Sequence, residues 1–181
     1  ARELKNQGRQ VTNVVIMGMG EPFQNYDAVR AAIDRLNAPD GLALGARRFT
    51  ISTVGLVPVI DRFADAARQI NLAISLHAAN DELRSSLLPI NKRYPIQSLI
   101  QACRNYVAKT NRRLTFEWAL IQNVNDRVQD AEELGVLIKG MLCHVNVIPL
   151  NPTSRFDGQA TTRERAELFK QTLENNGIPC T

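Results

Sequence analysis

Apolar segments of two kinds alternate along the chain, and this alternation constrains the fold more than any other feature of the sequence. Between short apolar runs lie longer segments whose apolar residues recur at the i, i+3, i+4, i+7 spacing of an amphipathic helix. The short runs, of strand length, are 13–17, 48–52, 71–76, 114–119 and 145–148. Regular alternation of strands and helices predicts an α/β fold of βαβ units, with about five parallel strands.

The same pattern fits two architectures, an open doubly wound sheet and a (β/α) barrel. A complete eight-fold barrel needs about 250 residues, so a barrel of 181 residues would be partial. The first run, 13–17, is continuously apolar after Asn13 and is expected to be covered on both faces. The length is that of a single domain, 1–181.

Several helix boundaries are marked by capping residues. Asn80 is expected to cap a short helix that ends before Pro89. Thr161, followed three positions later by Glu164, predicts a capping box at the start of the last helix, which Gly177 would terminate.

Composition and charge exclude some classes of protein. The chain is 44% apolar and 22% charged, which is ordinary for a soluble globular protein. Its net charge of +4 modestly favours an anionic partner such as RNA. No apolar run approaches the roughly 20 residues of a membrane helix, and no secretory signal is recognisable, so a cytoplasmic protein without a membrane partner is expected. The three cysteines lack metal-ligand spacing.

The clearest chemical signal is Gly-Met-Gly-Glu-Pro at 18–22, directly after the first strand. Glycine lets the backbone take unusual dihedral angles and approach a ligand closely. Glu21 argues against a phosphate and for a cationic group such as an amine. A dinucleotide-binding turn is disfavoured, because Phe23 stands where the third glycine belongs and no acidic residue ends the second strand.

Small polar residues recur at the carboxyl ends of the predicted strands, where both architectures bind ligands. Each has a structural alternative: a serine could cap the next helix, His77 could be a structural histidine, and Glu117 could be salt-bridged or misplaced by one residue in register. Together they favour a pocket for a polar, partly cationic ligand. The residues are Gly18, Gly20, Glu21, Ser52, Thr53, Ser75, His77, Glu117 and Asn151.

Five blocks of sequence, in order and with compatible spacing, resemble the radical S-adenosylmethionine (SAM) adenine methyltransferases of the RlmN/Cfr type. The blocks are 18–22, 47–55, 73–78, 88–92 and 148–152. The resemblance extends over nearly the whole chain, and although Gly-Glu-Pro alone is weakly specific, the ordered set of blocks is strongly specific. The resemblance implies a partial (β/α)6 barrel of the radical SAM type.

The resemblance also assigns SAM-binding residues. Gly20 and Glu21 would meet the amino end of SAM, which fits a carboxylate facing an ammonium group. Asn151 would lie by the adenine or ribose. The ribose and methionyl region would be lined by Ser52, Ser75, Leu76 and His77.

The chain departs from the family pattern at both ends. The Cys-x-x-x-Cys-x-x-Cys loop that holds the family's [4Fe-4S] cluster precedes the block that begins at Val14, and it is absent here. The C-terminal methyl-carrying cysteine is absent too, since Cys103, Cys143 and Cys180 do not match it. We therefore expect the central and C-terminal part of the barrel, with no catalytic residue or metal ligand in this chain and no activity by itself.

For the longer parent enzyme, the resemblance implies methylation of an adenine of large-subunit ribosomal RNA and, in some members, of a tRNA. One SAM methylates the carrier cysteine, and a second is cleaved to the radical that starts transfer to the adenine carbon. C2 is expected rather than C8, because C2 methylases are the commoner housekeeping type. An electron donor such as flavodoxin would reduce the cluster. The alternatives are a non-catalytic (β/α) small-molecule-binding module and another radical SAM enzyme.

Overall fold

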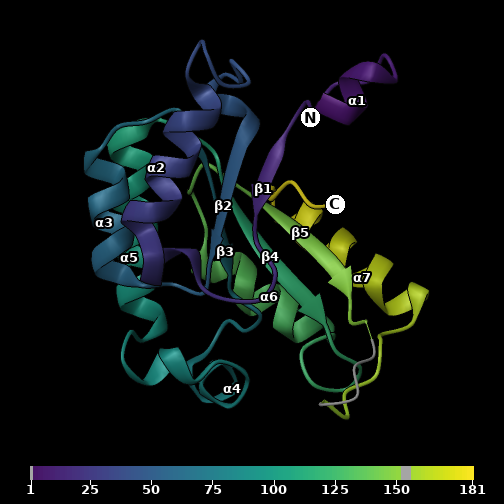
Figure 1. Cartoon of the computed structure of the whole chain (residues 1–181). Helices are drawn as coiled ribbons and strands as arrows, with labels where there is room; N and C mark the ends of the chain where they lie inside the picture. The colour runs from purple at the N-terminus through teal and green to yellow at the C-terminus, as the bar shows by residue number, and fades with distance from the viewer. Residues whose placement is uncertain (1, 152–155) are drawn as a thin grey trace.

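A computed structural model describes residues 2–151 and 156–181 and places five parallel strands in one sheet, in the order β1-β2-β3-β4-β5 (Figure 1). This confirms the predicted α/β fold. Pro152, within the last of the five sequence blocks, lies outside the described residues. The strands are β1 (Val14–Ile16), β2 (Phe49–Thr53), β3 (Asn71–Ser75), β4 (Leu114–Leu120) and β5 (Cys143–Pro149).

Helices follow the strands in the predicted alternation, and α2, α3 and α5 lie together on one side of the sheet (Figure 1). The α-helices are α1 (Arg2–Asn6), α2 (Tyr26–Asn37), α3 (Val57–Asp65), α4 (Asp81–Leu87), α5 (Ile96–Thr110), α6 (Val128–Leu137) and α7 (Arg163–Asn175). The described residues also form the short 3-10 helices η1 (Pro22–Asn25), η2 (Ala46–Arg48) and η3 (Pro89–Lys92). In the described part of the chain, no helix has the length and apolar character that crossing a membrane requires.

The two faces of the sheet differ sharply, and β4 shows this best. Its side chains alternate strictly, so that Phe116 and Trp118 are fully buried while Glu117 between them is only partly covered. The buried face packs against the helices in one continuous apolar core. The other face, called the inner face here, carries the polar members of the alternation.

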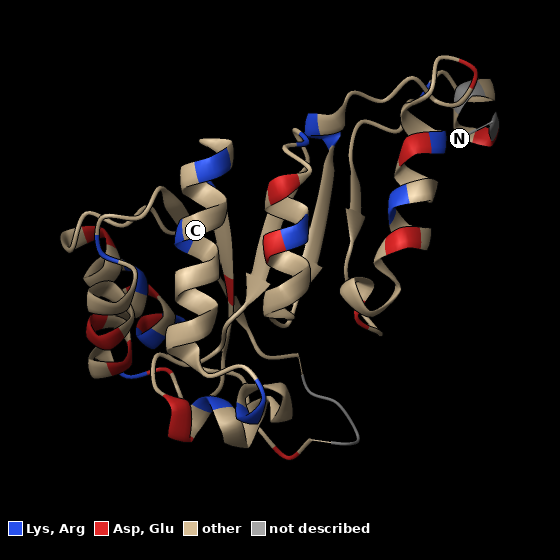
Figure 2. Cartoon of the chain, turned by 90° about the vertical axis from the view of Figure 1, so that its left-hand side faces the viewer, with Lys and Arg blue, Asp and Glu red and all other residues tan. Residues whose placement is uncertain are grey.

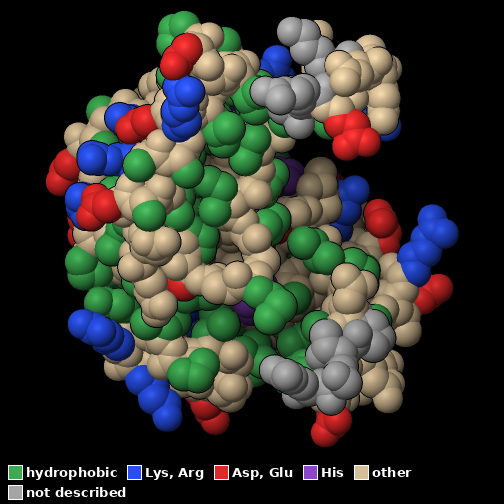
Figure 3. All heavy atoms as spheres, viewed as in Figure 1, with side chains coloured by type: hydrophobic (Ala, Val, Ile, Leu, Met, Phe, Trp, Pro, Cys, Tyr) green, Lys and Arg blue, Asp and Glu red, His purple; other side chains and the backbone are tan. Residues whose placement is uncertain are grey.

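The expectation that both faces of the first strand are covered is wrong. Val15 of β1 is 53% exposed, and Met17 directly after it is 52% exposed. Val15 points away from the apolar core, whereas its neighbours Val14 and Ile16 pack against it. Ile148 of β5 is exposed as well, and hydrophobic side chains accordingly reach the molecular surface in the view of Figure 3.

Two of the three predicted boundary signals are confirmed. The Asn80 side chain accepts a hydrogen bond from the Leu83 amide at 2.9 Å and caps α4, and Gly177, with φ +75°, follows the end of α7. The capping box at Thr161 is wrong by one residue. The Thr161 hydroxyl instead donates to the buried Asp126 carboxylate at 2.6 Å, and Thr162 caps α7.

The last residues extend the sheet beyond β5. The Val145 amide donates to the Pro179 carbonyl, and the Thr181 amide donates to the Val145 carbonyl. Cys180 thus forms a parallel bridge with Val145. The outer edge of β5 is therefore paired rather than free along this segment.

Candidate functional site

The loop after β1 and the carboxyl ends of β2 and β3 enclose a pocket of about 80 Å³. It brings together Gly18, Gly20, Glu21, Ser52 and Ser75, which come from three strand ends of the predicted site. Backbone and side chains of Met17, Thr53 and Val54 complete the lining. Parallel strands place their carboxyl ends at one edge, which explains how residues so far apart in sequence meet.

Glu21 is the only charged residue of this pocket lining, and two backbone amides fix its position. Oε1 accepts from the Phe23 amide at 2.9 Å, and Oε2 accepts from the Val54 amide at 2.8 Å. The first bond caps η1, and the second ties the β1 loop to the end of β2. Each carboxylate oxygen accepts more than one hydrogen bond, so the group can still receive an ammonium.

The two glycines of the loop supply conformation and space. Gly18 and Gly20 have φ values of +108° and +102°, which confirms the unusual dihedral angles predicted from the sequence. A Cβ atom on either would have no protein atom within 4 Å. The backbone at both positions is therefore open to a ligand, and Met19 between them is fully exposed.

Two serine hydroxyls form the floor between β2 and β3. The Oγ atoms of Ser52 and Ser75 lie 3.5 Å apart. Neither serine caps a helix, since α3 begins without a side-chain cap at Leu56 and α4 is capped by Asn80. The hydroxyls are thus available as donors and acceptors toward the pocket.

A fully buried arginine, Arg84 of α4, lies directly behind the pocket. Its guanidinium donates to the backbone carbonyls of Val54 at 2.7 Å, Ser75 at 3.3 Å and Leu76 at 3.2 Å. A fourth bond, at 2.9 Å, reaches the Asn91 side chain. Burial lowers the pKa of Arg84 to about 10, so the side chain stays charged at neutral pH. Arg84 thereby holds the ends of β2 and β3 together.

The sequence does not reveal Arg84 as a site residue, because an arginine on a short helix usually lies in solvent. Its neighbour in the network, Asn91, belongs to the sequence block at 88–92. Asn91 is also buried and donates to the Asp81 carboxylate at 2.8 Å. The block 88–92 is therefore connected to the pocket through Arg84, and none of its residues lines the pocket.

His77 follows β3 in the left-handed region, with φ +60°. Its Nδ1 accepts from the Ala119 amide at 3.0 Å, so in the neutral ring the proton is on Nε2. Its carbonyl accepts from the buried Asn125 side chain at 2.8 Å. Burial and, secondarily, the nearby Arg84 charge lower the pKa of His77 to about 4. His77 can therefore hold the β4 backbone through Nδ1 and still donate a hydrogen bond to a ligand through Nε2.

The remaining predicted residues are not part of the pocket lining. Leu76 has a fully buried side chain, and its amide donates to the Glu117 carbonyl. Glu117 lies in the middle of β4 and accepts from the Asn146 side chain at 2.8 Å, while burial raises its pKa. Asn151 is exposed after β5.

The cysteines do not resemble metal ligands or nucleophiles. All three are free and buried. Burial raises the pKa of Cys143 and of Cys180 to about 11, and it raises that of Cys103 further, so the thiols stay protonated. Within 2–151 and 156–181, no three His, Cys, Asp or Glu residues gather as a metal site would require.

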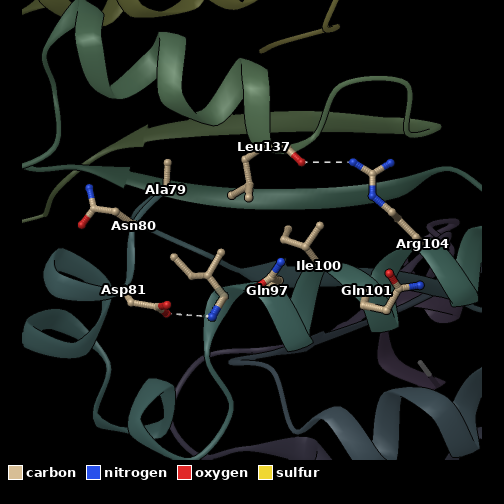
Figure 4. A pocket seen from close by; sticks show the side chains of 9 residues that line it. Ala79, Asn80, Asp81, Gln97, Ile100, Gln101, Arg104 and Leu137 are labelled. Atoms are coloured by element: carbon tan, nitrogen blue, oxygen red, sulfur yellow. Dashed lines mark hydrogen bonds between the residues drawn. The ribbon is translucent and has the colours of Figure 1, made fainter.

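A larger groove, of about 530 Å³, lies on the helix side between the start of α4, α5 and the end of α6 (Figure 4). Its two charged groups are already engaged. Asp81 accepts from the Ile96 amide at 2.8 Å, and Arg104 donates to the Leu137 carbonyl at 3.1 Å. None of the residues that line this groove also lines the Glu21 pocket.

A (β/α) sheet with a Gly-x-Gly-Glu turn at its carboxyl edge fits the radical SAM class of proteins. The family model described as the radical SAM superfamily matches residues 1–134, and the chain belongs to that superfamily. The crystal structure of a radical SAM methyltransferase from Sphaerobacter thermophilus superposes with a TM-score of 0.97 at 55% identity. The match covers 100% of this chain and 53% of that chain.

Within the superfamily, the sequence is similar to proteins named probable dual-specificity RNA methyltransferase RlmN, which confirms the resemblance found from the five blocks. The relative from Caldanaerobacter subterraneus is 53% identical over 95% of this chain and 50% of its own length. The relative from Geobacillus kaustophilus is 47% identical over 99% of this chain and 49% of its own length. The chain thus spans about half the length of the curated relatives it matches.

A domain of the pyruvate-formate lyase-activating enzyme from Bacteroides vulgatus shares the fold. It superposes with a TM-score of 0.70 at 15% identity, over 93% of this chain and 97% of that one. At this identity, the likeness concerns the arrangement of strands and helices alone.

We expect Gly20→Ala to destabilise the fold by about 1–2 kcal/mol, because an L-residue pays this in the left-handed region. Gly45→Ala is the matched control: Gly45 also has free space around its Cβ position, but its φ is −60°. The control should be neutral or slightly stabilising. Urea denaturation of both variants checks this, and equal effects would contradict it.

Arg84→Met should lower the free energy of unfolding by about 3 kcal/mol, because three buried or part-buried carbonyls lose their donor at about 1 kcal/mol each. Arg30→Met, on the exposed side of α2, should change it by less than about 0.5 kcal/mol. Chemical denaturation measures both. A loss for Arg84→Met as small as that for Arg30→Met would show that the network is dispensable.

The stability of the chain should fall as pH drops from about 6.5 to about 4. The unfolded state binds a proton at His77 near pH 6.5, while the folded state does so only near pH 4. The expected loss at pH 5 is about 2 kcal/mol. Asparagine tolerates the left-handed backbone, so His77→Asn should remove most of the change in unfolding free energy between pH 7 and pH 5. His144→Asn, the only other histidine, should remove less. Denaturant midpoints of the unchanged chain and of both variants, measured at pH 7 and at pH 5, check this prediction.

Proposed function

We propose that residues 1–181 form the SAM-binding part of a radical SAM RNA methyltransferase. The whole enzyme would methylate an adenine of ribosomal RNA at C2, and a tRNA adenine in addition. Support comes from the superfamily match and from relatives at about 50% identity that are named RNA methyltransferases. One observation carries the SAM part of the proposal: the Glu21 carboxylate, fixed by two amides, stands next to two glycines whose Cβ positions are open.

The chain's own residues fit SAM in chemistry. Glu21 would receive the ammonium of the methionyl end, and Gly20 would let the ligand approach the backbone. Ser52 and Ser75 would bind hydroxyl or carboxylate oxygens. His77 would donate through Nε2, and Asn151 would contact the adenine or ribose. The amide and the carbonyl of Leu76 are both hydrogen-bonded within the protein. Leu76 would therefore support the pocket only through the packing of its buried side chain.

The residues do not fit a [4Fe-4S] cluster. Its ligands are cysteine thiolates, whereas the three cysteines here are buried, protonated thiols remote from Glu21 in the sequence. The cluster, and the reducing partner that serves it, would have to be held by residues other than these. In the whole enzyme the cluster would supply the electron that cleaves SAM.

Binding of S-adenosylhomocysteine (SAH) and SAM to this chain, measured by isothermal titration, tests the proposal. Glu21→Ala should weaken SAH binding about tenfold or more, because a charge-assisted hydrogen bond is lost. Methylthioadenosine lacks the amino-acid end of SAH and serves as the control ligand. Its weaker binding should be unchanged by the substitution if Glu21 acts on the amine.

Equal loss for SAH and methylthioadenosine would mean that Glu21 only holds the loop, and the amine assignment would fail. No binding of any of the three ligands would contradict a SAM-binding role for the chain. Binding of SAH with no dependence on Glu21 would favour a non-catalytic module that binds nucleosides.

A further inference from the structure

A second polar pocket, of about 650 Å³, lies at the amino ends of β2, β3 and β4, at the opposite end of the strands from Glu21. We define it as the basic pocket. Three of its residues are arginines and none is acidic. The lining is Arg47, Thr50, Gln69, Asn71, Thr110, Asn111, Arg112, Arg113 and Thr115.

The arginines of the basic pocket have no carboxylate partner among the described residues: no ion pair there includes Arg47, Arg112 or Arg113. Elsewhere on the surface, acidic and basic side chains are mixed along the helices (Figure 2), and pairs such as Arg62 with Asp27 form at 2.6 Å. Three uncompensated cations close together repel one another, and the repulsion disappears when an anion binds.

Arg112 is held ready for a ligand by neutral groups. One terminal nitrogen donates to the Gln69 side-chain oxygen at 2.8 Å, and the other donates to the Asn71 side-chain oxygen. Asn71 in turn donates to the Arg47 carbonyl at 3.0 Å, which ties the two arginines together. The Arg112 Nε atom is buried and has no hydrogen-bond partner within the described residues. A buried donor without an acceptor costs free energy, so the arginine is held in place without all of its hydrogen bonds.

We propose that the basic pocket binds a phosphate group. The available donors are guanidinium, amide and hydroxyl groups spread over three strand ends, and they suit an anion with oxygens pointing in several directions. A carboxylate, with two oxygens in one plane, would leave part of this set unused. The volume admits a phosphate with a nucleoside attached. The source of the group is a small phosphorylated compound or the backbone of RNA. The site is separate from the Glu21 pocket and does not depend on SAM binding.

The test is titration calorimetry of the 181-residue chain with inorganic phosphate, with AMP and with a single-stranded RNA ten-mer that has no terminal phosphate. Arg47→Gln and Arg113→Gln, both exposed and outside the core, should each weaken binding about five- to tenfold. Arg30→Gln on α2 is the matched control and should leave it unchanged. Acetate should neither bind nor compete.

The pattern of binding distinguishes the sources. Phosphate and AMP binding that depends on the two arginines, without RNA binding, assigns a small compound. RNA binding that depends on the two arginines assigns the RNA backbone, provided that it also weakens with salt. For a single strand, the logarithm of the binding constant should fall by roughly 0.7 for each neutralised phosphate when the salt concentration rises tenfold. The proposal is overturned if none of the three probes binds, if acetate binds equally well, or if Arg30→Gln matches the pocket variants. Thermal unfolding of each variant confirms that it is folded.

Discussion

The candidate site depends on a buried charge that satisfies backbone carbonyls at the ends of two parallel strands. Carbonyls beyond the last ladder bond need donors, and if they are buried without them the fold loses free energy. Arg84 supplies these donors to Val54, Ser75 and Leu76 at once. Val54 is then held on both sides of its Cα atom, because its amide donates to Glu21 while its carbonyl accepts from Arg84. The Glu21 pocket and the buried arginine are thus linked through a single residue.

Much of the fold could be predicted from the sequence, because alternation and boundary residues are local signals. The strands, the Asn80 cap and the Gly177 terminus were of this kind. The site elements Glu21, Ser52 and Ser75 were found because carboxyl ends of parallel strands meet. Arg84 and Asn125 were not, since their role appears only when distant carbonyls come together. Thr161 was misassigned because a tertiary partner, Asp126, competes for its hydroxyl.

The two ends of the strands differ in electrostatic character. The carboxyl end presents one carboxylate, Glu21, among glycines and hydroxyls. The amino end presents three arginines among amides. One end of the sheet therefore carries a pocket with a negative charge, and the other end carries a pocket with positive charges. Formal net charge, only +4 over the whole chain, conceals this separation.

The alternation along β4 has a consequence for folding as well as for binding. A slip of one residue against β3 or β5 would bring Glu117 into the core and turn Phe116 and Trp118 toward water. Burial of an unpaired carboxylate and exposure of two aromatic rings would each cost several kcal/mol. The polar side chains on the inner face of β4 thereby disfavour misaligned pairings of the sheet.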